Sequence, residues 1–139
     1  MTPQQVALVQ ASFAKVAPIA DQAAALFYSR LFETAPETRE LFHGDIDAQG
    51  KKLIAAIATV VRGLGDIDVI APAVRELAQR HVAYAVRPEH YAIVGGALLG
   101  TLEQCLAADF TPQVQAAWAT AYGALSQMMI ASAYPGERP

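Results

Sequence analysis

Cysteine is almost absent from this 139-residue chain, and charged residues are few. The single cysteine, Cys105, has no partner for an internal disulfide, and one thiol excludes a cysteine-rich metal site. Charged residues make up only 17% of the chain, and its ten Lys and Arg are scattered, with a net charge of -3. No basic stripe is available to neutralise phosphates, so we expect no nucleic-acid partner.

Signals for secretion or membrane insertion are also missing. The first residues hold no basic segment followed by an apolar block, so the sequence predicts a protein that stays in the cytoplasm. The longest stretch without charge, 110–136, is interrupted throughout by Thr, Gln, Ser, Gly and Pro. This composition favours a buried or partner-facing helix over a membrane span, and it leaves monomer and homodimer equally open.

The motifs of several enzyme classes are absent as well. The chain contains no Gly-x-Ser-x-Gly, no glycine-rich phosphate loop, no His-Glu-x-x-His and no Cys-x-x-Cys-His. Apolar residues, in contrast, make up 54% of the chain. This composition excludes a disordered chain and, at this length, predicts a single domain over residues 1–139 with a substantial core.

Apolar residues recur at helical spacing, and strand alternation and internal repeats are absent. Thr2-Pro3 and Thr111-Pro112 are typical of helix starts, where a hydroxyl caps the helix and proline fits its first turn. We expect one long helix over 48–64, a connection over 66–71 and another helix beginning at Pro72. The sequence predicts an all-α fold of about seven or eight helices that cross at steep angles around a pocket.

A small set of residues on these predicted helices suits a haem iron. His81 shares a helix face with apolar residues, and a neutral imidazole is a strong ligand of haem iron. Tyr28 and Gln49 would offer hydrogen bonds to oxygen bound on the opposite side. Leu53, one turn after Gln49, would cover that side, and Phe42 would lie against the porphyrin plane.

Each of these polar residues has a second interpretation. His81 fits an ordinary helix histidine, Tyr28 fits a core residue whose hydroxyl binds a backbone carbonyl, and Gln49 fits a solvent-facing residue near a helix start.

Two further residues would suit the haem propionates. His43 directly follows the corner residue Phe42, and Lys52 lies one turn beyond Gln49, although both residue types are commonly solvated. The sequence otherwise predicts His90 at the surface, and Trp118 and Tyr122 in the core.

Several short motifs occur in a specific order between about Gln4 and Met129. They are Phe27-Tyr28-x-x-Leu31-Phe32, Pro36-Glu37-x-Arg39-x-Leu41-Phe42, Gln49-x-x-x-Leu53, Arg80-His81, His90-Tyr91-x-Ile93-Val94-Gly95-x-x-Leu98-Leu99 and Ala117-Trp118-x-x-x-Tyr122-Gly123. In this order they resemble the bacterial single-domain haemoglobins, which share their globin domain with the flavohaemoglobins. The resemblance implies a globin fold holding one non-covalent haem b with its iron, and dioxygen, carbon monoxide or nitric oxide as ligands.

The resemblance also assigns roles to individual residues. Tyr28 matches the distal tyrosine, Gln49 the distal glutamine and Leu53 the distal apolar residue of the family. Phe42 matches the phenylalanine that packs on the haem, and His81 matches the proximal iron ligand.

On the proximal side the sequence departs from the family pattern. Tyr91 matches a tyrosine that, in the flavohaemoglobins, joins a carboxylate to support the proximal histidine, and Val94 of the same motif is expected at the haem. Ala133 occupies the position of that carboxylate, and no acid occurs between Asp109 and Glu137. A carboxylate makes a histidine ligand more basic and promotes turnover of oxygen species, so its loss favours reversible oxygen binding.

The leading interpretation is therefore an oxygen-binding globin for storage or delivery, rather than an enzyme. A nitric oxide dioxygenase that uses a separate reductase remains an alternative, as does a haem-free globin-like sensor or interaction domain. Because position 49 is Gln and not His, we expect the sixth iron position to be open or occupied by water, with direct binding of Tyr28 to ferric iron as an exception.

Overall fold

The chain folds into helices in a computed structural model that describes residues 2–41, 45–83 and 88–133. A number of side chains within these ranges, including those of His81 and Ala133, lie outside the description. The helices are α1 (Pro3–Val16), η1 (Ala17–Ile19), α2 (Ala20–Thr34), η2 (Pro36–Leu41), α3 (Ile46–Arg62), α4 (Ile67–Ala83), α5 (Pro88–Leu106), η3 (Ala107–Asp109) and α6 (Pro112–Ala133), where η denotes a 3-10 helix. The described residues contain no β-strand, which confirms the all-α class. The sequence predicts seven or eight helices, and the described residues form six α-helices and three short 3-10 helices.

Both predicted helix starts are confirmed by their capping bonds. The Thr2 hydroxyl accepts the backbone N–H of Gln5 at 3.1 Å, and the Gln5 side chain accepts the backbone N–H of Thr2 at 3.0 Å. At the start of α6 the Thr111 hydroxyl accepts the N–H of Val114 at 3.2 Å. Each bond satisfies a backbone group that has no partner within its helix, so local sequence sets these two boundaries.

The predicted connection over 66–71 is wrong, because α4 already begins at Ile67 and runs through Pro72. Proline lacks the N–H that would bond to the carbonyl four residues earlier, which normally ends or kinks a helix. Here Ile70 precedes the proline and Val74 follows it, and both are buried in one core cluster. The burial of these side chains on both sides of Pro72 offsets the missing hydrogen bond.

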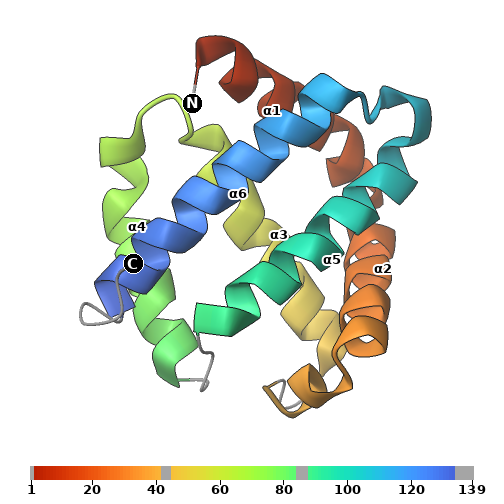
Figure 1. Ribbon diagram of the computed structural model, residues 1–139, viewed down its shortest axis with the longest axis vertical. Helices are drawn as coiled ribbons and strands as arrows, with labels where there is room; N and C mark the ends of the chain where they lie inside the picture. The colour runs from red at the N-terminus through yellow and green to blue at the C-terminus, as the bar shows by residue number, and fades with distance from the viewer. Residues whose placement is uncertain (1, 42–44, 84–87, 134–139) are drawn as a thin grey trace.

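Two helices at the front of the molecule, α5 and α6, lie across the others (Figure 1). The last helix, α6, packs against α1 and α4, whereas α2 packs against α3 and α5. The helices splay apart instead of running parallel as in a bundle (Figure 1), and helices that cross in this way enclose space between them.

The core consists of three clusters of buried side chains. The first joins α1 to α6 and includes Val9, Val16 and Trp118; the second includes Val60, Val74, Tyr91 and Met129; the third includes Phe27, Tyr28, Leu31 and Ala97.

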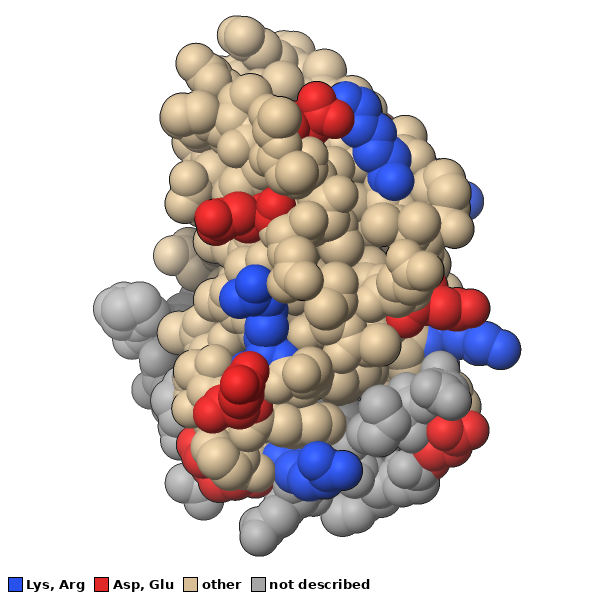
Figure 2. Space-filling view, turned by 90° about the vertical axis from the view of Figure 1, so that its right-hand side faces the viewer, with Lys and Arg blue, Asp and Glu red and all other residues tan. Residues whose placement is uncertain are grey.

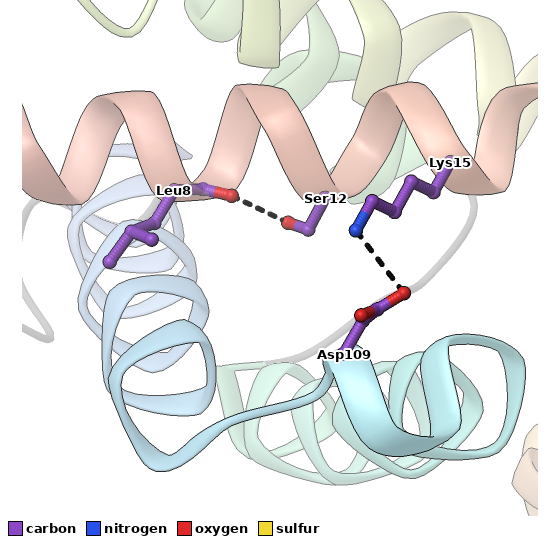
Figure 3. A network of polar contacts seen from close by, with 4 residues as sticks. All are labelled: Leu8, Ser12, Lys15 and Asp109. Carbon is purple, nitrogen blue, oxygen red and sulfur yellow. Dashed lines mark hydrogen bonds and ion pairs between the residues drawn. The ribbon is translucent and has the colours of Figure 1, made fainter.

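Polar contacts attach α1 to its neighbours. The buried indole N–H of Trp118 donates to the Ser12 hydroxyl at 2.8 Å, and that hydroxyl donates to the Leu8 carbonyl at 2.7 Å. One turn further, Lys15 pairs with Asp109 of η3 at 3.2 Å (Figure 3), with more than half of each side chain exposed. An exposed pair of this kind contributes little, so the buried bond between Ser12 and Trp118 is the stronger polar link.

Charges of both signs are interspersed on the face that Figure 2 shows, and several positive and negative side chains lie next to each other. Among the described residues, one helical segment, His90–Asp109, is long and apolar enough to cross a membrane. The core helix of a soluble protein meets the same test, and the α5 part of this segment packs against α2, α6 and α1.

Candidate functional site

An apolar cavity of about 160 Å³ lies among the crossing helices. Its walls come chiefly from α3, α5 and α6, with single contributions from α1, α2 and α4. The lining residues include Val9, Phe27, Leu53, Ala56, Ile57, Val60, Leu77, His90, Tyr91, Val94, Leu98, Trp118, Tyr122, Leu125 and Met129. Such a concave, apolar site with a few polar groups is the usual form of a small-molecule or cofactor site.

Three of the residues predicted from the sequence line this cavity. Leu53 reaches it from α3, and Tyr91 and Val94 reach it from α5. Tyr91 is buried, with 7% of its surface exposed, while Leu53 and Val94 are half-buried. The cavity therefore brings together a residue expected on the distal side, one expected on the proximal side and one expected at the haem.

Tyr28 is buried directly behind this wall. Its ring packs edge-on against Phe27, which lines the cavity, with centroids 5.2 Å apart. It also shares a core cluster with Leu53 and Val94, but it does not itself border the cavity. The phenol of Tyr28 is protonated at neutral pH and can donate a hydrogen bond; burial raises its pKa to about 12, so it stays a donor in alkaline solution as well.

A glycine lets α3 approach the ring of Tyr28. A Cβ on Gly50 would lie 2.9 Å from the Cβ of Ala24 and 3.7 Å from Cε2 of Tyr28. A side chain at position 50 would force α2 and α3 apart. Its absence lets the part of α3 that carries Leu53 pack against the core cluster of Tyr28.

Gln49 and Lys52 do not border the cavity. Gln49 is half-buried in the first turn of α3, and its backbone N–H donates to the Asp45 carbonyl at 3.0 Å. Leu53 follows Gln49 by one turn and does line the cavity, so Gln49 lies on the same side of α3 as that wall. Lys52 is exposed.

The predicted iron ligand lies on α4, close to the end of the described helix. Leu77 of α4 lines the cavity, and residue 81 follows it by one turn on the same helix face. The side chain of His81 lies outside the description, and Phe42 and His43 lie outside the described residues altogether. Within the described part of the chain, no three His, Cys, Asp or Glu side chains gather in a way that could hold a metal.

The structure adds polar residues to the cavity wall that the sequence interpretation did not assign to the site, namely His90, Tyr122 and Ser126. His90, expected at the surface, is half-buried and lines the cavity. Tyr122, expected only in the core, lines it as well and donates its hydroxyl to the Tyr91 carbonyl at 2.6 Å. Burial, and secondarily the neighbouring Tyr91, raise the pKa of Tyr122.

Glycine accounts for the place of the Tyr122 ring. A Cβ on Gly95 of α5 would lie 2.7 Å from Cε2 of Tyr122, so the ring rests on the bare backbone of α5. The only sequence signal was the presence of Gly95 and Tyr122 in separate motifs, and nothing in the spacing indicated that they meet.

The chain matches a known family and several known proteins. Residues 25–129 match the sequence profile of the family described as Globin. The flavohemoprotein of Bordetella parapertussis is 35% identical over 133 residues, which cover 94% of this chain and 33% of that protein. The flavohemoprotein of Vibrio cholerae is 36% identical over 107 residues, 75% of this chain and 27% of that protein.

A solved structure has the same fold. The bacterial globin from Campylobacter jejuni superposes with a TM-score of 0.86 at 23% identity, covering 96% of this chain and 97% of that one. The chain spans about a third of the length of the flavohemoproteins it matches.

Proposed function

The chain belongs to the globin family, and from this premise we propose that it binds one haem b in the apolar cavity and a diatomic ligand, foremost dioxygen, on the haem iron. The observation that carries the proposal is the cavity itself, which is apolar and lies beside the helix face on which position 81 stands.

The chemistry of the cavity wall suits a porphyrin. Its walls are aliphatic and aromatic side chains from α3, α5 and α6, which suit the apolar faces of the macrocycle and keep water away from them. His81 would supply an imidazole nitrogen to the iron, next to Leu77 of the wall. Phe42, His43 and Lys52 are proposed to contact the haem edge and its propionates. When bound, the haem supplies a ferrous iron that takes up a diatomic gas.

Tyr28 and Gln49 are proposed to retain the ligand. A tyrosine phenol and a glutamine amide both keep their protons at physiological pH, so Tyr28 and Gln49 remain donors. In a pocket that excludes water, a donor to a partly negative ligand contributes more than it would in solvent.

On the proximal side, hydrogen bonding supports Tyr91 through its backbone. The Tyr122 hydroxyl binds the Tyr91 carbonyl, while the chain has no acid between Asp109 and Glu137 to support a histidine ligand. A neutral proximal side supports reversible binding over oxidative turnover. We further propose that the chain is a single cytoplasmic domain, monomeric or homodimeric, without nucleic-acid or membrane partners.

Absorption spectra of the purified protein, ferric and ferrous, test the proposal. The haem-loaded protein should show a Soret band that shifts when carbon monoxide or oxygen is added. His81→Ala should abolish this shift or convert the spectrum to that of weakly held haem, while the control His90→Ala, at a histidine of the cavity wall, should keep it. A protein that stays colourless after haem is supplied would instead favour a haem-free sensor or interaction domain.

A nitric oxide dioxygenase is the second candidate, favoured by the flavohemoproteins among its relatives. Conversion of nitric oxide and oxygen to nitrate consumes one electron per turnover, which a separate reductase would supply. Stoichiometric nitrate formation with an added flavin reductase would support this activity. Release of intact oxygen with negligible nitrate would support storage or delivery.

A further inference from the structure

A series of three side chains leads from the surface to the buried phenol of Tyr28. The rings of Tyr28 and Phe32 stack, with centroids 5.9 Å apart and planes inclined by 22°. The guanidinium of Arg39 lies over the Phe32 ring, 5.0 Å from its centroid. Tyr28 is buried, Phe32 is half-buried and Arg39 is exposed, so the series runs from the core cluster outward.

The two ends of this series stand on firmly held backbone. Tyr28 and Phe32 are four residues apart on α2, the spacing at which side chains meet on one helix face. Arg39 stands on η2 next to Thr38, which is 1% exposed and whose hydroxyl donates to the Ala35 carbonyl at 2.7 Å. The guanidinium of Arg39 therefore extends over the Phe32 ring from a turn that a buried hydrogen bond stabilises.

These contacts restrict where the Tyr28 ring can lie. Phe27 meets the ring edge-on, Phe32 stacks against it, and the backbone of α3 at Gly50 approaches Cε2. An aromatic ring held between other rings and a helix backbone has few alternative rotamers. Removal of the Phe32 ring opens one side of this enclosure, while removal of the Arg39 cation loosens Phe32 itself.

We propose that Phe32 and Arg39 are positioning residues that orient the Tyr28 phenol, and thereby set how fast the pocket releases a bound diatomic ligand. The inference rests on the proposed function and deepens it, because it gives the distal donor a support that reaches the surface through η2. Neither residue is expected to touch haem or ligand.

A double-mutant cycle on the haem-loaded protein separates this role from a general loss of structure. Oxygen dissociation is measured by stopped-flow for Phe32→Leu, Arg39→Ala and Arg39→Lys, each in the wild-type and in the Tyr28→Phe background. Phe32→Leu should speed release by about fivefold, the effect of a weakened hydrogen bond. Arg39→Ala should speed release by about two- to fivefold, as expected for a lost cation–π contact. Arg39→Lys keeps a cation at this position, so its release rate should stay near that of the wild type.

In the Tyr28→Phe background all three substitutions should leave the release rate unchanged, because the group they orient is gone. The carbon monoxide stretching band gives a readout that general destabilisation does not move: it should shift toward the Tyr28→Phe position in Phe32→Leu and Arg39→Ala. Glu37→Gln, at an exposed residue of the same turn, is the matched control and should change neither rate nor band.

If Phe32→Leu and Arg39→Ala each changed the release rate as much in the Tyr28→Phe background as in the wild type, the proposal would be overturned. The proposed haem site would be unaffected by that result. If Tyr28→Phe itself left oxygen release unchanged, the distal role of Tyr28 in the proposed function would fail instead. Because Arg39 is exposed, its variants keep the test decisive even where Phe32→Leu does not fold.

Discussion

Single residues in this molecule depart from ordinary behaviour where burial or backbone geometry demands it. Burial raises the pKa of the Tyr28 phenol to about 12, and Ala107 adopts a φ of 49°, a left-handed conformation that usually belongs to glycine. The first property follows from the fold and the second from the turn between α5 and α6, so neither is visible in the residue type alone.

The stability of the protein should fall as pH rises from 10 toward 12. The pKa of Tyr28 is raised from 10.0 to about 12, so the folded state retains a proton that the unfolded chain releases, and the stabilisation is lost as the pH passes through that interval. A two-unit shift corresponds to about 3 kcal/mol at most. Measured by denaturant between pH 8 and 11.5, the free energy of unfolding should decline less steeply for Tyr28→Phe than for wild type. Parallel declines would show that the pKa of Tyr28 is not raised in the folded state.

Ala107→Gly should stabilise the protein by up to about 1 kcal/mol, because glycine removes the left-handed strain at a smaller cost in unfolded-chain entropy. The measurement is the midpoint of chemical unfolding at constant m value. Ala108→Gly, in the same exposed turn, is the control and should lower the midpoint. A lower midpoint for Ala107→Gly as well would show that the backbone is not strained there.

Pairs of helices are held together by close backbone approaches and by a few buried hydrogen bonds. Where α5 crosses α6, the Tyr122 ring lies on Gly95, and where α1 meets α6, Trp118 donates to Ser12. Both contacts join residues far apart in the sequence. Each can be tested by one substitution at the contact and a second substitution at a nearby residue of the same helix.

Gly95→Ala and Gly96→Ala should change stability in opposite directions. A Cβ at position 95 would lie 2.7 Å from the Tyr122 ring, whereas position 96 is open. The first substitution should cost about 1–2 kcal/mol through overpacking and displace the ring from the cavity wall. The second should stabilise by about 0.5–1 kcal/mol because alanine favours the helix. Thermal unfolding measures both effects. Equal shifts of the melting temperature would show that the Tyr122 ring does not rest on Gly95.

Ser12→Ala should destabilise the protein by about 1–3 kcal/mol, since the buried indole N–H of Trp118 loses its acceptor. Lys15→Ala on the same helix removes only the exposed pair with Asp109 and should cost less than about 1 kcal/mol. Denaturant unfolding distinguishes the two, and the tryptophan fluorescence should shift only in Ser12→Ala. Similar losses for both variants would mean that the indole finds another acceptor.

Local sequence predicted those helix boundaries that depend on local chemistry. The caps at Thr2 and Thr111 were readable because a hydroxyl and a proline, joined at Thr2 by the side chain of Gln5, act within four residues of each other. The start of α4 was misplaced because burial of Ile70 and Val74 overrides the usual effect of Pro72, and burial depends on helices from elsewhere in the chain. The same reason explains why Tyr122 and His90 were missed: helix crossings decide which side chains face the cavity, and periodicity alone does not specify crossings.

At the scale of the whole molecule, the crossing helices surround an apolar cavity, and the stability of the protein should depend on what fills that cavity. A bound ligand in excess stabilises the native state, by about 2.7 kcal/mol at a hundredfold excess over its dissociation constant. Removal of haem should therefore lower the melting temperature by about 10 °C in a chain of this size. Calorimetry with and without added haem measures the difference; it should nearly vanish in His81→Ala and persist in His90→Ala.

The hydrogen bond from Trp118 to Ser12 joins residues 106 positions apart and ties the last helix to the first. During synthesis, α1 emerges from the ribosome before α6 has been made, so its apolar side stays uncovered until α6 follows. Contacts of such sequence separation also form late in refolding, because a long loop must close first. Nascent chains arrested before Trp118 should accordingly expose α1 to chaperones and proteases, and chains extended beyond α6 should protect it.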